Sequence, residues 1–143
     1  MVSSGVLGDW YANLLNCGPQ RYVLCQSERT LLPVILPARN ESFPAEFSST
    51  LQKVLRSLGV PREAVEQEAS AAHEIQIART RSRQVLGTMN DFAFNAQVQL
   101  AHARSHDRVL EACLRLAEMP SKPIGYDAPG RLALSLFRSP GVH

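Results

Sequence analysis

Long hydrophobic runs are missing from this sequence of 143 residues. The apolar run at residues 31–36 is among the longest, and it is far shorter than the about 20 residues of a membrane-spanning helix. The first ten residues, MVSSGVLGDW, contain no basic region followed by a long apolar stretch, so no secretory signal is visible. We therefore expect a cytoplasmic protein that does not associate with a membrane.

The sequence also lacks a large excess of charge. Fifteen basic and thirteen acidic side chains give a formal net charge of +2, which is too small to attract a polyanion by itself. Aromatic residues make up 6% of the chain, and none lies among the arginines at residues 79–83, so a base-stacking surface is disfavoured. Nucleic acid held through phosphate contacts stays open as a partner, but a protein partner is favoured.

Cysteine is scarce, and its spacing excludes the common cysteine sites. The three cysteines form no CxxC pair, and the four histidines do not stand at zinc-ligand spacing beside them. No nucleophile elbow, HExxH motif or glycine-rich phosphate loop is present. We expect no metal and no cofactor, and no residue pattern provides evidence for an enzyme.

The remaining composition is that of a folded domain, with 45% hydrophobic and 20% charged residues. Residues 9–16, 21–27 and 31–37 read as three strands joined by tight turns, which predicts an antiparallel meander. The second strand is apolar on both faces and should be central. Pro33 and Pro37 cannot donate ladder hydrogen bonds, so the third strand should lie at an edge.

Helical spacing of apolar residues begins at Pro44 and ends before Gly59, and a second helix follows from Pro61. Residues 73–80 alternate as a half-buried strand that returns to the sheet. Two further helices follow, the first with Ser82 as a plausible N-cap and the second with Asp107. Their predicted apolar stripes are Val85, Met89, Phe92, Ala96 and Leu100, and then Val109, Leu110, Cys113, Leu114 and Leu116.

These elements predict an α+β fold. An antiparallel sheet of three to four strands, made of the N-terminal meander and one later strand, would be packed by about four helices. Residues 1–143 form a single domain. Within it, residues 121–143 are expected to dock as a short strand or helix, or to form a loosely docked tail.

The most informative segment is TRSRQVLGTMNDFAF at residues 80–94. Arginines at alternate positions of an extended segment point to one side, so they could converge on one anion. The helix that follows carries a glycine and two short polar residues among its apolar side chains. The candidate binding residues are therefore Arg79, Arg81, Arg83, Gly87, Asn90 and Asp91.

Each of the helix residues also has a structural interpretation. Gly87 costs about 1 kcal/mol relative to alanine, and close packing of the helix on the sheet would explain it. Asp91 could pair with one of the arginines or with the Trp10 N–H, and Asn90 could satisfy a backbone group. The structural interpretations are the ones we favour from sequence.

Two blocks, LGDWYANLL followed by the meander ending ERTLLPVILPA, and ARTRSRQVLGTMNDFAF, resemble a family of small bacterial proteins classed as a domain of unknown function. Its members share an Asp-Trp-Tyr/His-Ala-Asn-Leu opening and an Arg-Ser-Val-Leu-Gly-Ser-Met-Asn-Asp-like helix. The resemblance covers residues 7–101, with Gln84 and Thr88 as departures. It implies a bacterial cytoplasmic α+β domain and brings no activity with it.

Two functions follow from these residues. The first is a non-catalytic module that binds a macromolecule through the arginines and the polar edge of residues 87–95, in toxin neutralisation or in phage and host regulation. The second is a small enzyme or sensor that binds a phosphorylated metabolite or nucleotide at the same arginines, with Asp91 as a base. An enclosed cleft at the arginines would favour the second.

Overall fold

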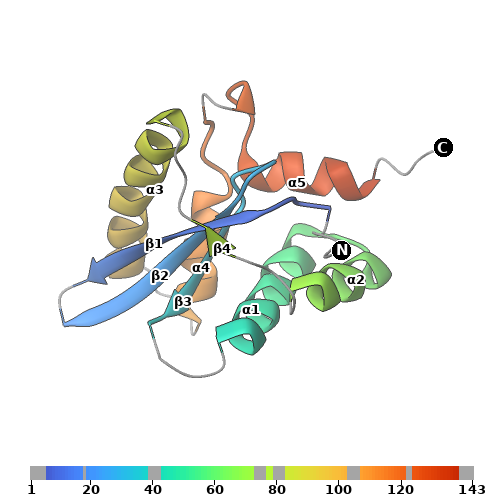
Figure 1. Ribbon diagram of the computed structural model, residues 1–143, viewed down its shortest axis with the longest axis horizontal. Coiled ribbons are helices and arrows are strands. Elements are labelled where there is room, and N and C mark those ends of the chain that lie inside the picture. Colours follow the sequence, from blue (N-terminus) through green and yellow to red (C-terminus); the bar gives the residue numbers. More distant parts are fainter. Residues whose placement is uncertain are drawn as a thin grey trace.

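Three strands of the sheet come from the N-terminal quarter of the chain. The computed structural model describes residues 6–17, 19–38, 43–72, 77–78, 83–102, 107–121 and 124–138. Strands β1 (Trp10–Cys17), β2 (Gln20–Ser27) and β3 (Pro33–Pro37) form the predicted antiparallel meander (Figure 1). The spatial order is β3-β2-β1-β4, so the apolar β2 is central and the proline-containing β3 lies at an edge, as predicted.

The fourth strand, β4 (Ile77–Ala78), pairs with β1 in the parallel direction, Trp10 opposite Ile77. The chain travels from β3 to β4 through two helices, and such a crossover connection brings two strands into the same direction. The later strand is therefore present, but it makes the sheet mixed rather than wholly antiparallel. The other residues of the predicted strand at 73–80 lie outside the described part of the chain.

Helices in the described part of the chain number five, one more than expected. They are α1 (Phe43–Leu58), α2 (Arg62–Ala72), α3 (Arg83–His102), α4 (Arg108–Leu116) and α5 (Pro129–Arg138). Together with the meander they confirm the α+β class. No helix among the described residues has the length and apolar character needed to cross a membrane.

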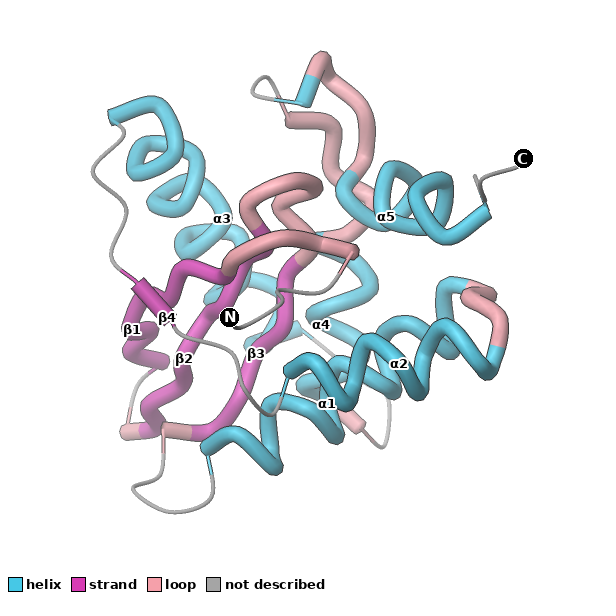
Figure 2. The backbone as a smooth tube through the Cα atoms, turned by 45° about the vertical axis from the view of Figure 1, so that its right-hand side comes forward, coloured by secondary structure: helices cyan, strands magenta, loops and turns pink. Residues whose placement is uncertain are grey.

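The two helices predicted after the meander, α1 and α2, form a helical hairpin beside β3 (Figure 2). Gly59 follows α1 with φ at +93°, a left-handed conformation that glycine adopts at little cost and that ends the helix. The hydroxyl of Ser48 donates to the carbonyl of Ala69 at 3.1 Å, which joins the two helices inside the core. Phe47 of α1 packs edge-on against Trp10 of β1, with ring centroids 4.9 Å apart.

Helix α2 also holds the segment that precedes β1. The buried carboxylate of Glu68 accepts the N–H of Val6 at 2.9 Å and the N–H of Leu7 at 3.2 Å. The Leu7 side chain is fully buried, and Arg29 donates to the carbonyl of Val6 at 2.9 Å. The entry into β1 is therefore held by hydrogen bonds on both sides of the peptide chain.

Helices α3 and α4 pack against each other and against the sheet, α3 on β1 and α4 on β3. The predicted N-cap of α4 is confirmed, because Asp107 Oδ1 accepts the N–H of Leu110 at 3.0 Å. Four residues of the predicted α3 stripe are buried, and they are Met89, Phe92, Ala96 and Leu100. The α3 face toward the sheet is therefore the one that the apolar spacing indicated.

The apolar segment near the C-terminus is the helix α5. Its Ala133 is fully buried, and Gly130 in its first turn donates its N–H to the carbonyl of Ala117 at 2.8 Å. A Cβ atom at Gly130 would lie 2.9 Å from Leu58 Cδ2 and 3.2 Å from the Ala117 carbonyl oxygen. The segment was expected to be a strand, a helix or a loose tail, and the structure shows the helix. Gly130 allows α5 to lie close to α1 and to the end of α4.

Candidate functional site

The six candidate residues fall at the start of α3 and before it. Arg79 and Arg81 lie outside the described residues, and Arg83 is the first residue of α3. Gly87, Asn90 and Asp91 lie within the helix and are all exposed. The three arginines therefore remain a prediction from sequence, whereas the three helix residues have a place on the surface.

The favoured explanation of Gly87 is wrong. A Cβ atom built at this glycine would meet nothing within 4 Å, so the absence of a side chain permits no close approach to the sheet. The residue faces outward because the helix turns its other side, which carries Met89 and Phe92, toward the core. Packing against the sheet therefore does not account for the glycine.

One of the structural partners proposed for Asp91, the Trp10 N–H, is also wrong. Trp10 is 1% exposed and packs against Phe47, whereas Asp91 lies on the exposed side of α3. The backbone carbonyl of Asp91 accepts a hydrogen bond from Asn95 Nδ2 at 2.9 Å. The carboxylate of Asp91 and the amide of Asn90 are thus presented at the surface of the helix.

Replacing Gly87 with alanine is expected to raise the free energy of unfolding by about 0.5–1 kcal/mol, because alanine favours the helix and has open space here. The measurement is urea unfolding of the wild-type and variant proteins. Gly130→Ala is the matched control and should lower stability by about 1–3 kcal/mol through overpacking. A loss of stability in Gly87→Ala would restore the packing explanation.

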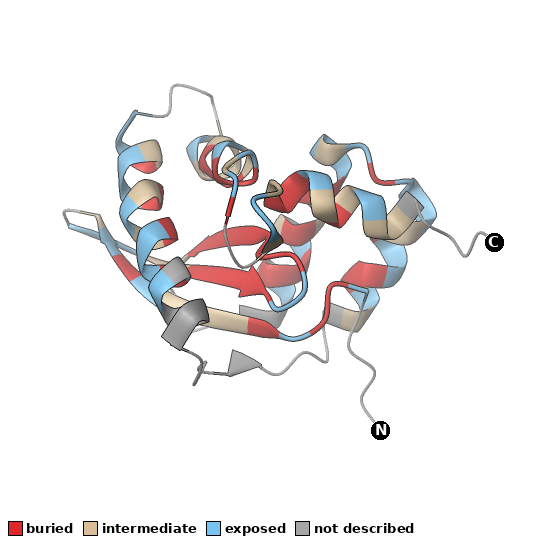
Figure 3. Cartoon of the chain, turned by 90° about the horizontal axis from the view of Figure 1, so that it is seen from above, coloured by how far each residue is buried: buried red, intermediate tan, exposed pale blue. Residues whose placement is uncertain are grey.

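The exposed side of α3 forms a continuous surface, which we call the outer face of α3. Seen from above, buried positions line the side of α3 toward the sheet and exposed positions line the other (Figure 3). At helical spacing of three and four residues, the outer face comprises Gly87, Asn90, Asp91, Phe94, Val98 and Ala101. Three of the six candidate residues therefore share one surface.

Phe94 also lies on the outer face of α3, although it is not among the six candidate residues predicted from sequence. Its side chain is 67% exposed, and Val98, one turn further along α3, is 37% exposed. The signal was present in the sequence, since Phe94 and Val98 are an i, i+4 apolar pair opposite the stripe of Phe92 and Ala96. A large aromatic side chain thus stands at the centre of the outer face.

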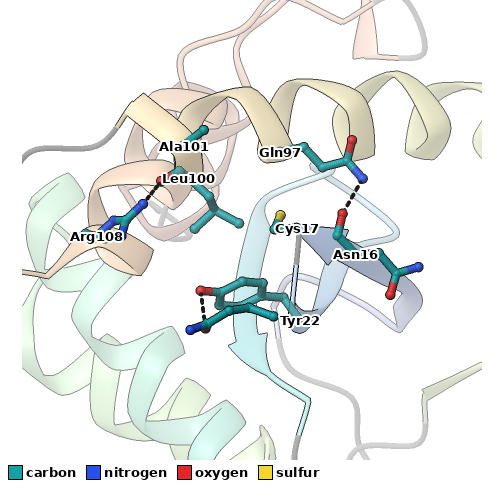
Figure 4. Close-up of a pocket in the computed structure, with 8 residues that line it drawn as sticks. Asn16, Cys17, Tyr22, Gln97, Leu100, Ala101 and Arg108 are labelled. Carbon is teal, nitrogen blue, oxygen red and sulfur yellow. Dashed lines mark hydrogen bonds between the residues drawn. The ribbon is translucent and has the colours of Figure 1, made fainter.

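A pocket of about 540 Å³ lies beside the C-terminal end of α3, between that helix, the β1–β2 hairpin and the start of α4. Figure 4 shows the Leu100 side chain, the Cys17 sulfur and the Tyr22 ring around a common space. The described residues that line the pocket are Asn16, Cys17, Gln20, Tyr22, Gln97, Leu100, Ala101 and Arg108.

Three hydrogen bonds hold the walls of this pocket. Gln97 Nε2 donates to the carbonyl of Asn16 at 2.9 Å, which ties α3 to the end of β1. The Tyr22 hydroxyl donates to Gln20 Oε1 at 3.1 Å. The guanidinium of Arg108 donates to the carbonyl of Leu100, one of the last carbonyls of α3. The walls are thus connected to one another by polar contacts at the surface.

The three cysteines differ in burial, and only one of them lines the pocket. All three cysteines are free, and burial raises the pKa of each thiol, that of Cys113 to about 12. Cys25 and Cys113 are completely buried, whereas Cys17 is half-buried and lines the pocket. Among the described residues, no group of three histidine, cysteine, aspartate or glutamate side chains could hold a metal ion.

Comparison with known proteins identifies a family. Neither a curated protein nor a solved structure matches the chain. A protein-family model described as "Domain of unknown function (DUF6933)" matches residues 2–132, which is most of the chain and includes both α3 and the pocket. The chain therefore belongs to this family of proteins with a domain of unknown function.

Proposed function

We propose that this protein is a non-catalytic interaction module that binds a protein partner through the outer face of α3. The observation that carries the proposal is the 67% exposure of Phe94 in the middle of that face. Aromatic side chains are enriched at protein interfaces and among the residues that dominate their binding energy. The core-facing stripe of α3 is complete without Phe94, so this exposed side chain has no evident role in folding.

Burial of Phe94 by a partner would be energetically favourable. Full burial of a phenylalanine side chain contributes about 1.5–3 kcal/mol, and Phe94 leaves most of that contribution unused in the free protein. Val98 lies beside Phe94 on the same face and would add apolar contact area. A partner that covers both residues would bury apolar surface that the fold leaves exposed, and this burial would stabilise the complex.

The surroundings of Phe94 resemble the organisation of an interface, with polar groups around an apolar centre. Asn90 and Asp91 lie one turn toward the N-terminus of α3, and Gln97 lies toward the C-terminus. Gly87 leaves room at the N-terminal end of the face. Helix α3 has 20 residues and is therefore about 30 Å long, enough to span one side of a standard interface.

The predicted arginines would extend this face. Arg83 begins α3, and Arg79 and Arg81 precede it in the sequence, so the partner would carry acidic groups opposite the N-terminal end of the helix. Such charges increase the association rate more than they increase the affinity. We propose that this partner is a toxin that the protein neutralises, or a regulator from a phage or its host.

Photo-crosslinking tests the proposal. A photoreactive phenylalanine analogue introduced at position 94 is expected to yield one dominant crosslinked protein in cells, because the proposed interface covers this residue. Position 126 is the matched control, since Tyr126 has a similar exposure of 68% and lies in a turn outside the outer face of α3. Crosslinked products are identified by mass spectrometry.

Two experimental results would contradict the proposal. If positions 94 and 126 yield the same products, Phe94 has no specific partner. If the protein crosslinked at position 94 does not bind the purified chain, or binds the Phe94→Ser variant as tightly as the wild type, the outer face of α3 is not the interface.

A further inference from the structure

The pocket beside the C-terminal end of α3 has the size of a small-molecule site. Its volume of about 540 Å³ falls in the range of about 300–1,000 Å³ that is usual for small-molecule sites. Its walls come from three parts of the sequence, the β1–β2 hairpin, the last two turns of α3 and the first residue of α4. Such a hollow is larger than the gaps that packing leaves in a core.

The described residues that line the pocket carry charge of one sign only. Arg108 is the one ionised side chain among the described residues that line the pocket, and none of them is acidic. A guanidinium has five N–H donors, and the bond from Arg108 to the Leu100 carbonyl uses one of them. The described residues give Arg108 no carboxylate partner, so further donors are available to a ligand.

The other walls are suited to an organic molecule. The Leu100 side chain, the Cys17 sulfur and the Tyr22 ring supply apolar surface around the space, as Figure 4 shows. The Tyr22 hydroxyl, held by Gln20, and the amide of Gln97 supply polar groups at the margin. The pocket therefore combines one cation with an apolar and partly aromatic wall.

We propose that this pocket binds a small organic carboxylate, with the carboxylate at Arg108 and the carbon skeleton against Leu100 and Tyr22. The planar fork of a guanidinium matches a carboxylate through two parallel hydrogen bonds. A phosphate monoester, by contrast, carries about −1.5 to −2 charges at neutral pH, and the one cation among the described lining residues would leave part of that charge uncompensated. The chemistry of the lining thus favours a carboxylate over a phosphate.

Arg108 also has a structural role, since it satisfies a carbonyl at the end of α3. That role by itself requires no pocket and no preference for anions. The two explanations therefore differ in one measurable property, the selectivity of the pocket for an anion over a neutral molecule of the same shape.

The experiment uses Cys17 as a reporter, because it lines the pocket and the other two thiols are fully buried. Alkylation by iodoacetamide is followed at pH 9, since burial raises the pKa of the Cys17 thiol. Benzoate is the carboxylate probe and benzamide is its neutral counterpart. We expect benzoate to slow alkylation about threefold when its concentration is twice the Kd, and benzamide to have little effect at the same concentration.

Equal protection by benzoate and benzamide, or protection by neither, would overturn the proposal with the wild-type protein alone. Arg108→Gln should abolish the preference for benzoate, whereas Arg115→Gln, which removes the same charge from another position on α4, should retain it. Labelling of Cys25 and Cys113 reveals any variant that has unfolded. A folded Arg108→Gln protein that still prefers benzoate would also overturn the proposal.

Discussion

Replacing Phe92 with alanine is expected to lower the free energy of unfolding by about 3–5 kcal/mol, because the substitution removes a large side chain from a closely packed core. Phe92 is 1% exposed and lies on the side of α3 that faces the sheet. Urea unfolding followed by circular dichroism gives the change in stability directly.

Phe94→Ala is the matched control, the same substitution two residues along the same helix. Its side chain is 67% exposed, so the change in stability should stay within about 0.5 kcal/mol. Similar losses in the two variants would mean that Phe94 also supports the fold. In that case its exposure would no longer point to a partner.

Glu68→Ala is expected to lower stability by about 2–4 kcal/mol, because hydrogen bonds to a charged acceptor contribute about 1.5–3 kcal/mol each and do not add fully. The carboxylate accepts two backbone N–H groups, those of Val6 and Leu7, and it is 4% exposed. The N–H of Leu7 would lose its acceptor inside the core. Faster hydrogen exchange at the Leu7 amide should accompany the loss.

Glu66→Ala serves as the comparison on the same helix. Glu66 pairs with Arg62 at 3.3 Å on the surface, and exposed pairs of this kind contribute about 0.5 kcal/mol or less. If Glu68→Ala costs no more than Glu66→Ala, the buried carboxylate does not hold the segment before β1.

Much of the fold could be predicted because its signals are local. The meander follows from tight turns between apolar runs, and Pro33 and Pro37 place β3 at an edge through their missing donors. The buried side of α3 follows from the spacing of Met89, Phe92 and Ala96. Each of these inferences depends on residues within a few positions of one another.

What the sequence missed or left open depends on residues that lie far apart along the chain. The parallel pairing of β4 with β1 arises from the crossover through α1 and α2, which no strand pattern specifies. The apolar segment at residues 132–137 was too short to be assigned to strand or helix by its periodicity. The structure shows it as part of α5 (Pro129–Arg138), whose Gly130 lies close to Leu58 and Ala117.

Only part of the candidate site could be predicted, because local signals do not show which distant residues lie together. Gly87, Asn90 and Asp91 stood out as unusual helix residues, but only the fold shows that they share an exposed face with Phe94. The pocket was not predicted at all. Its walls join Cys17 and Tyr22 of the hairpin to Arg108, about ninety residues later in the chain, and no local pattern reports such a contact.

The affinity of the protein captured at position 94 tests the central claim most directly. Isothermal titration calorimetry should show that Phe94→Ala weakens binding of that partner at least tenfold, equivalent to about 1.4 kcal/mol, whereas Tyr126→Ala leaves the Kd unchanged. An unchanged Kd for Phe94→Ala would contradict the assignment of the outer face of α3 as the interface.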